Sequence, residues 1–201
     1  GVEDVNMTGS RDVGGLVGWN DGSITACYAT GSVTGTVIDN YACAGGLVGT
    51  NYYGTLTACY ATGLVTGRYA VGGLVGYNHS MLTDCYASGS VRGDEYFGGL
   101  VGYNNSGTIT SCYATGSVSE GNNAGGLVGY NSGSITSCYA TGLVTGHTVG
   151  GLVGWNYEGT LTGCYATGSV SGTGAVGGLM GYNDYGTGSI TSCYATGSVT
   201  G

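Results

Sequence analysis

Residues 125–146 read GGLVGYNSGSITSCYATGLVTG, and this stretch recurs with small changes seven times along the chain. A Gly-Gly-Leu triplet marks each copy, and the triplets begin at Gly14, Gly45, Gly72, Gly98, Gly125, Gly150 and Gly177. Successive triplets are 25 to 27 residues apart, apart from a first interval of 31 that carries extra loop residues. A period of this length indicates a repeat architecture in which each copy is one structural unit.

Within each copy, short strand-like segments alternate with clusters of Gly, Asn, Asp and Ser, which are typical of turns. No segment has the apolar spacing of three and four residues that predicts a helix. We therefore predict an all-β fold, a parallel β-solenoid of about seven coils with one repeat of about 26 residues per coil. Equivalent strands of neighbouring coils would stack about 4.8 Å apart.

The repeats predict a single domain, residues 1–201, in which residues 1–13 are a partial repeat or cap. The segment Val5–Gly9 (VNMTG) lines up with the CYATG run of the full copies. Two corners vary in length between copies, and they are longest at residues 36–44 and 184–189. We expect copy-specific chemistry at these corners.

The strand at residues 138–144 predicts which side chains face inward. Alternation places Cys138, Ala140, Gly142 and Val144 on the inner face. Tyr139, Thr141 and Leu143 then face outward, and Leu127 and Ile135 supply the larger apolar groups of the core. The abundant glycines, 46 in all, are predicted to serve corners that need a positive φ and a narrow interior without room for a Cβ.

Two further sets of equivalent residues are predicted to form structural ladders. The asparagines are expected to stack their side-chain amides on one another and on the backbone, rather than to bind ions or sugars. They are Asn20, Asn51, Asn78, Asn104, Asn131, Asn156 and Asn183. The second set is formed by Cys27, Cys59, Cys85, Cys112, Cys138, Cys164 and Cys193.

The cysteines leave two interpretations open. Buried free thiols that act as small apolar side chains are favoured, because seven is an odd number and a parallel register need not meet disulfide geometry. Coil-to-coil disulfides are the alternative. The eighth cysteine, Cys43, lies in the long loop and is the candidate for reactivity or pairing. Zinc binding is not expected, because the sequence contains no C-x-x-C pair.

Two outward aromatic rows are the candidate ligand or stacking surface. The first is formed by Tyr28, Tyr60, Tyr86, Tyr113, Tyr139, Tyr165 and Tyr194. The second is formed by Trp19, Tyr77, Tyr103, Tyr130, Trp155 and Tyr182, and Thr50 interrupts it. Such rows would stiffen the sheet by stacking, and they would also offer a flat platform to glycan rings or to another protein.

Composition excludes several classes of function. The chain has three arginines, no lysine and eleven acidic residues, for a net charge of −8. This balance disfavours binding to nucleic acid or to anionic lipid, and no apolar run is long enough to insert into a membrane. The acidic residues fall on loops without a repeating partner, so no calcium site or other metal site is predicted. No nucleophile, base and oxyanion donor recur together, so we expect neither an enzyme nor a cofactor.

The GGLVGxN motif (GGLMGYN in the last copy) and the CYATG run resemble the GLUG-motif repeat family over nearly the whole chain. In that family the repeats are non-catalytic segments of large bacterial surface proteins, among them adhesin-like proteins and some secreted immunoglobulin-cleaving proteases. The resemblance implies an extracellular or cell-surface location.

The expected function is a structural or adhesive module, a rigid spacer in a surface protein or fibre. Its partners would be glycans or other surface proteins, and its open ends would favour head-to-tail self-association. One alternative is an ice-binding solenoid, suggested by the outward hydroxyl row although the tyrosines beside it argue against this. Its members are Thr30, Thr62, Ser88, Thr115, Thr141, Thr167 and Thr196. Another alternative is an accessory region of a larger secreted enzyme.

Overall fold

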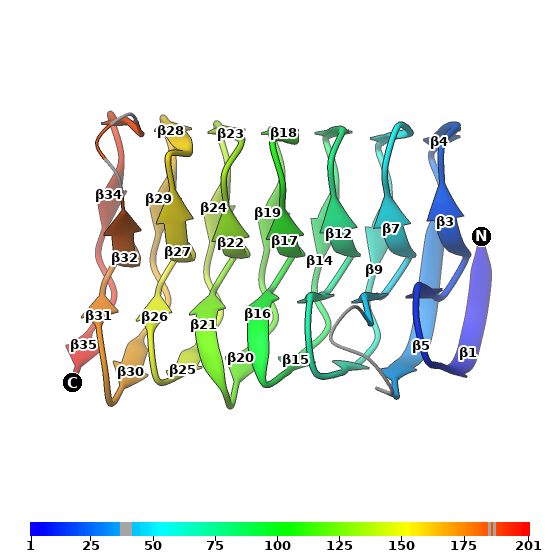
Figure 1. Ribbon diagram of the computed structural model, residues 1–201, viewed down its shortest axis with the longest axis horizontal. Coiled ribbons are helices and arrows are strands. Elements are labelled where there is room, and N and C mark those ends of the chain that lie inside the picture. The colour runs from blue at the N-terminus through cyan, green and yellow to red at the C-terminus, as the bar shows by residue number, and fades with distance from the viewer. Residues whose placement is uncertain (37–41, 185, 187) are drawn as a thin grey trace.

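A computed structural model describes residues 1–36, 42–184, 186 and 188–201. The predicted fold class is confirmed, since the described residues form β-strands and no helix, and the strands wind into a parallel solenoid of about seven coils. The coils stand side by side along the long axis of the molecule, and the chain runs from one end of the row to the other (Figure 1). The two variable corners include residues 37–41, 185 and 187, which lie outside the described residues.

Four parallel sheets run along the solenoid, and each coil contributes to all four. We name them after a residue that recurs in each. The glycine sheet contains β2 (Val13–Gly14), β6 (Ala44–Gly45), β11 (Val71–Gly72), β16 (Glu95–Gly98), β21 (Asn122–Gly125), β26 (Val149–Gly150) and β31 (Val176–Gly177). The asparagine sheet contains β3 (Val17–Asn20), β7 (Val48–Asn51), β12 (Val75–Asn78), β17 (Val101–Asn104), β22 (Val128–Asn131), β27 (Val153–Tyr157) and β32 (Met180–Asp184).

The other two sheets complete the coil. The aliphatic sheet contains β4 (Ser23–Thr25), β8 (Thr55–Thr57), β13 (Met81–Thr83), β18 (Thr108–Thr110), β23 (Ser134–Thr136), β28 (Thr160–Thr162) and β33 (Ile190–Thr191). The tyrosine sheet contains β1 (Val2–Gly9), β5 (Tyr28–Gly35), β9 (Tyr60–Ala61), β10 (Val65–Thr66), β14 (Tyr86–Ala87), β15 (Val91–Arg92), β19 (Tyr113–Ala114), β20 (Val118–Ser119), β24 (Tyr139–Ala140), β25 (Val144–Gly146), β29 (Tyr165–Ala166), β30 (Val170–Gly172), β34 (Tyr194–Ala195) and β35 (Val199–Thr200).

Equivalent residues of neighbouring coils pair with one another. Tyr103, for example, lies between Tyr77 and Tyr130 in the asparagine sheet. Tyr113 lies between Tyr86 and Tyr139 in the tyrosine sheet. Like residues therefore stack on like residues, and a side chain that faces inward in one coil does so in the next.

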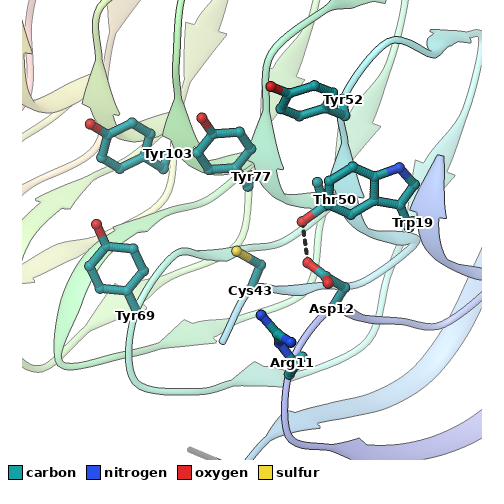
Figure 2. A pocket seen from close by; sticks show the side chains of 9 residues that line it. All are labelled: Arg11, Asp12, Trp19, Cys43, Thr50, Tyr52, Tyr69, Tyr77 and Tyr103. Carbon is teal, nitrogen blue, oxygen red and sulfur yellow. Dashed lines mark hydrogen bonds between the residues drawn. The ribbon is translucent and has the colours of Figure 1, made fainter. Parts of the chain in front are cut away.

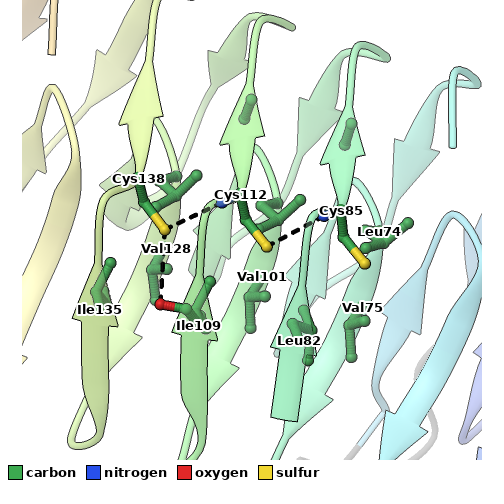
Figure 3. Close-up of a cluster of buried hydrophobic side chains, with 14 of the residues drawn as sticks. Leu74, Val75, Leu82, Cys85, Val101, Ile109, Cys112, Val128, Ile135 and Cys138 are labelled. Carbon is green, nitrogen blue, oxygen red and sulfur yellow. Dashed lines mark hydrogen bonds between the residues drawn. The ribbon is translucent and has the colours of Figure 1, made fainter. Parts of the chain in front are cut away.

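The inner face agrees with the alternation in the sequence. Cys138, Ala140 and Val144 are fully buried, whereas Thr141 and Leu143 are exposed. The larger apolar residues of each coil pack against the cysteines to form a cluster that runs along the solenoid, part of which is shown in Figure 3. A second cluster of valines, alanines and Phe97 lies between the glycine sheet and part of the tyrosine sheet. The strands of that part are β5, β10, β15, β20, β25 and β30.

Glycines allow opposite walls of the coil to approach closely. A Cβ on Gly73 would lie 2.1 Å from the backbone oxygen of Gly99 and 2.9 Å from the Ala87 Cβ. The same clash, with equivalent partners, recurs at Gly99 and Gly126. Since a side chain of any size would force these walls apart, the predicted narrow interior is present.

The predicted role of glycine at positive-φ corners is mostly wrong. The recurring left-handed corner is the residue just before the ladder cysteine, and in six of seven coils it is not glycine. The corner is formed by Ala26, Ala58, Asp84, Ser111, Ser137, Gly163 and Ser192, with φ between 52° and 62°. Thr-x-Cys in the sequence gives no sign of this, because packing of the flanking strands overrides the local preference.

The predicted alignment of the N-terminal segment is also wrong. Val5–Gly9 pairs with residues 31–35 of β5 (GSVTG) and not with the CYATG run. The two alignments differ by four residues, an even number, so both keep the same side chains on the same face and alternation cannot distinguish them. The structure selects the pairing with residues 31–35, in which β1 extends back far enough for its first residue, Val2, to pair with Ala29.

The left-handed corner leads to a paired stability prediction. Ala58→Gly should raise the free energy of unfolding by about 0.5–1 kcal/mol, because relief of the left-handed strain exceeds the entropic cost of glycine. Gly163→Ala should lower it by a similar amount, because the new Cβ has room, with Ser137 Oγ 4.0 Å away, and only the φ of 62° is unfavourable. Thermal or urea unfolding measures both, and a shift of the same sign in the two variants would contradict the corner's role.

Candidate functional site

The ladder asparagines lie in one file at the end of the asparagine sheet. From Asn51 to Asn156 they are fully buried. Each side-chain Nδ2 donates to the Oδ1 of the next asparagine, at 2.8–2.9 Å in all six links from Asn20 to Asn183. Several of the same amides also donate to a backbone oxygen of the following turn, such as Asn104 to Gly107 at 3.0 Å. With its amides engaged internally, the file is structural and offers no ligand surface along its length.

The ladder cysteines also form one file, and none of the seven is disulfide-bonded in the structure. Each thiol donates to the backbone oxygen of the threonine two residues earlier, at 3.1–3.3 Å. Sulfur also accepts the amide N–H of the preceding coil's cysteine, as between Cys85 N and Cys112 Sγ at 3.3 Å. Hydrogen bonds with Cys138 and Cys85, together with burial, raise the pKa of Cys112. Cys27 and Cys193, in the end coils, are half-buried.

The first aromatic row forms a continuous stack on the outside of the tyrosine sheet. Successive rings from Tyr28 to Tyr194 have centroids 4.9–5.2 Å apart and planes within 8° of parallel. The rings are half-buried along the solenoid, and Tyr194 in the last coil is 54% exposed. Beside them the hydroxyl row is exposed from Thr62 to Thr196. The side chains of the two rows are uncharged, and a carboxylate contacts the row at its first ring, where the Tyr28 hydroxyl donates to Glu3 at 2.8 Å.

The second aromatic row is less regular. Tyr77 and Tyr103 are stacked at 5.5 Å and Tyr103 and Tyr130 at 4.2 Å, but Trp155 meets its neighbours edge to face. Tyr69, Tyr96 and Tyr157 from adjoining turns add rings to the same cluster. The Nε1 of Trp155 is buried without a hydrogen-bond partner. Neighbouring rings restrain this cluster more than the sequence alone indicated.

A pocket opens where Thr50 interrupts the second aromatic row. Its volume is about 350 Å³, and it is lined by Arg11, Asp12, Trp19, Cys43, Thr50, Tyr52, Tyr69, Tyr77 and Tyr103. Cys43 and Thr50 lie between the aromatic rings and the Arg11–Asp12 pair (Figure 2). Sequence reasoning missed this pocket, although the break at Thr50 marked its place. Tyr52 and Tyr69 belong to no repeating position that the sequence singled out.

The polar groups of the pocket lie at one side. Thr50 Oγ1 donates a hydrogen bond of 2.5 Å to Asp12 Oδ1, and Thr50 is 3% exposed. Burial raises the pKa of Cys43 to about 12 from its ordinary value of 9.0, although a hydrogen bond with Thr50 acts in the opposite direction. Cys43 is thus a buried wall residue of the pocket with a raised pKa. Its expected reactivity or pairing stays a prediction.

Neither histidine lies in this pocket. His79 Nδ1 is 2.7 Å from the backbone oxygen of Asn105, and His147 Nδ1 is 3.0 Å from Thr173 Oγ1. In the described part of the chain, no three His, Cys, Asp or Glu side chains are grouped so that they could hold a metal ion. Among those same residues, we find no helix with the length and apolar character needed to cross a bilayer.

Stacked coils and in-register ladders define a solenoid repeat protein. The family model of the GLUG motif matches the chain seven times, at residues 9–34, 40–66, 67–92, 93–119, 120–145, 145–171 and 172–200. The matches span nearly the whole sequence, so the chain belongs to the GLUG-motif family, as its GGLVGxN and CYATG motifs predicted. Searches of curated proteins and of solved structures gave no match.

The asparagine file can be tested at its middle. Asn104→Ala removes one hydrogen bond from Asn78 and two donated to Asn131 and Gly107. Since each buried polar group left unsatisfied costs roughly 1–3 kcal/mol, unfolding should become easier by at least about 2 kcal/mol. The neighbouring half-buried Asn105 bonds the Tyr77 hydroxyl, and Asn105→Ala is the control, with a smaller effect expected. Chemical denaturation measures both, and equal losses would refute a special role for the file.

Burial also predicts the order in which the cysteines react. The thiolate is the nucleophile, and a pKa of about 12 leaves Cys43 protonated at pH 8. In the native protein, iodoacetamide should therefore label Cys27 and Cys193 first and label Cys43 only after unfolding or at a pH approaching 12. Peptide mass spectrometry after timed labelling gives the order. Early modification of Cys43 at pH 8 would contradict its burial in the wall of the pocket.

Proposed function

We propose that the chain is a non-catalytic structural and adhesive module of a bacterial extracellular or cell-surface protein or fibre. In this proposal the solenoid is a rigid spacer, and its outer aromatic rows contact glycans or other proteins. Membership in the GLUG-motif family supports the repeat-module part. The surface location and the adhesive role rest on the resemblance to surface proteins and on the character of the outer faces.

The tyrosine row is the observation that carries the adhesive part. Its parallel rings present a continuous strip about one ring wide, and the exposed hydroxyl row runs beside it. The faces of the inner rings are covered by their neighbours, so a pyranose would lay its apolar C–H face across the outward ring edges and hydrogen-bond the adjacent hydroxyl row. A flat protein surface with few charges would also suit the tyrosine row.

The spacer part is supported by how the coils hold together. Each coil is joined to the next by parallel strand pairings in all four sheets, by the asparagine amides and by a shared core. Bending between coils would break several of these contacts at once. A repeat stack of this kind therefore resists local bending and keeps surfaces at its two ends apart.

End-to-end contact is a further part of the proposal. The last coil exposes apolar side chains at its outer edge, with Ile190 43%, Val199 48% and Tyr194 54% exposed. The unpaired edges of β33, β34 and β35 could add the strands of another coil, whether in a longer chain or in a second copy. Light scattering over a range of protein concentrations would reveal association of separate copies.

The adhesive part is tested with glycan and matrix-protein arrays. The double variant Tyr113→Ser, Tyr139→Ser interrupts the row in the middle of the solenoid, and we expect array signals at least about fivefold weaker, given the roughly 0.5–1.5 kcal/mol of each aromatic contact. The control is Tyr53→Ser, which removes a 69% exposed tyrosine outside the row. Unchanged binding by the double variant would contradict the role of the row, and a blank array for the native chain would reduce the proposal to a spacer.

A further inference from the structure

The break in the second aromatic row is a vacancy of one ring. Six of the seven equivalent positions carry Trp or Tyr, and only the second coil carries the small Thr50. Thr50 pairs in register with Trp19 on one side and with Tyr77 on the other. Neighbouring strands are about 4.8 Å apart, so the rings on either side of Thr50 are two strand spacings apart. Tyr52, two residues beyond Thr50, stacks on Trp19 and takes part of this space, and the remainder is the pocket over Thr50.

The pocket over Thr50 is partly open to solvent, since Trp19 is 51% exposed and Arg11 is exposed, and aromatic rings form its walls. Tyr52 stacks on Trp19 at 5.2 Å and on His79 at 5.0 Å, so its position is fixed from both sides. Tyr69 lies parallel to Tyr103 at 6.4 Å on the far wall. The resulting cavity of about 350 Å³ is at the lower end of the range of small-molecule sites, and its walls are mainly aromatic.

The polar groups at the rim specify the charge of the occupant. Arg11 is exposed and offers only donors, and Asp12 offers a carboxylate of which one oxygen already accepts from Thr50. Together the pair carries no net charge. A cation would meet the Arg11 guanidinium, and an anion would meet Asp12 on a chain of net charge −8. A neutral molecule with several hydroxyls can use both groups.

The tyrosine hydroxyls of the pocket favour the same class of molecule. Burial raises the pKa of Tyr69 and of Tyr77, so both hydroxyls stay neutral at physiological pH. The Tyr77 oxygen accepts a hydrogen bond of 2.6 Å from Asn105 Nδ2, which leaves its own proton to donate elsewhere. Neutral donors next to aromatic faces suit a hydroxylated ring better than they suit an ion.

We propose that this pocket binds one pyranose ring of a neutral glycan, seated over Thr50 between the Trp19–Tyr52 stack and Tyr77, with its hydroxyls on Asp12, Arg11 and Tyr77. The pocket deepens the glycan-binding part of the proposed function, and it is a second place on the solenoid, separate from the tyrosine row. It gives the module one site of defined shape in addition to a repeating surface.

The fluorescence of Trp19 reports on the site directly. The chain has two tryptophans, so Trp155→Phe leaves Trp19 as the only one. In that background we expect methyl glycosides of neutral hexoses to change Trp19 emission with dissociation constants in the millimolar range, which is typical of one small polar ring. Methyl glucuronide and choline are the anionic and cationic probes, and both should bind at least about tenfold more weakly.

Thr50→Tyr supplies the missing ring and should abolish the response while it completes the aromatic row. Ser171→Tyr is the matched control, because it adds a tyrosine at an exposed outward position in β30, far along the solenoid. Asp12→Asn is the second variant, read by Trp19 emission in the same Trp155→Phe background, and should weaken neutral glycosides at least about tenfold since it removes the charged acceptor. Circular dichroism checks the fold of each variant. If Thr50→Tyr does not fold, Asp12→Asn alone tests whether the pocket binds neutral glycosides.

The outcomes separate this site from the tyrosine row. The Tyr113→Ser, Tyr139→Ser variant should bind methyl glycosides at Trp19 as tightly as the native chain, even if its array signals are lost. The pocket proposal is overturned by no response to any neutral hexoside, by undiminished binding in folded Thr50→Tyr or in Asp12→Asn, or by tighter binding of glucuronide or choline. None of these results bears on whether the tyrosine row is adhesive.

Discussion

An unbroken chain of buried amide hydrogen bonds fixes every coil against the next. The asparagine file can form only if all coils share one register, because a slip of one residue would point the amides outward and turn polar side chains into the core. Buried amides without partners are costly, so the file penalises every alternative stacking. The apolar residues of the core are similar from coil to coil and would tolerate several arrangements. The amides single out one.

Register in turn determines the rest of the backbone. Once like residues lie over like residues, the cysteine N–H of one coil meets the sulfur of the next, and this explains a thiol after the corner, where alanine would offer neither the acceptor nor the volume of sulfur. The same corner holds the preceding residue in the left-handed region, which most of these side chains do not prefer. The backbone keeps this strained conformation because the stacked strands on both sides of the corner fix its path.

The sequence predicted what repeats and missed what does not. The coil period, the inner face of Cys138 to Val144 and the rows of asparagine, cysteine and tyrosine follow from counting and alternation. The N-terminal register could not, since a four-residue shift leaves the alternation of Val5–Gly9 unchanged. Nor could the inward position of Cys43, or the pocket beside it. That pocket draws on Asp12, Trp19, Tyr52 and Tyr69 from three different coils and turns, and only folding brings them together.

A regular solenoid shows the same surface at every coil, so regularity by itself supplies many weak contacts and no single site. Specificity needs a departure from the repeat. Thr50 is such a departure: in this one coil a small residue replaces a ring. Tyr52 covers part of the space by stacking on Trp19, and a pocket of about 350 Å³ remains because the paired strands hold the other rings in place. The stiffness that makes the chain suitable as a spacer therefore also keeps the vacancy open. In a softer fold the loss of one ring would have been repaired by collapse of its neighbours, at little cost.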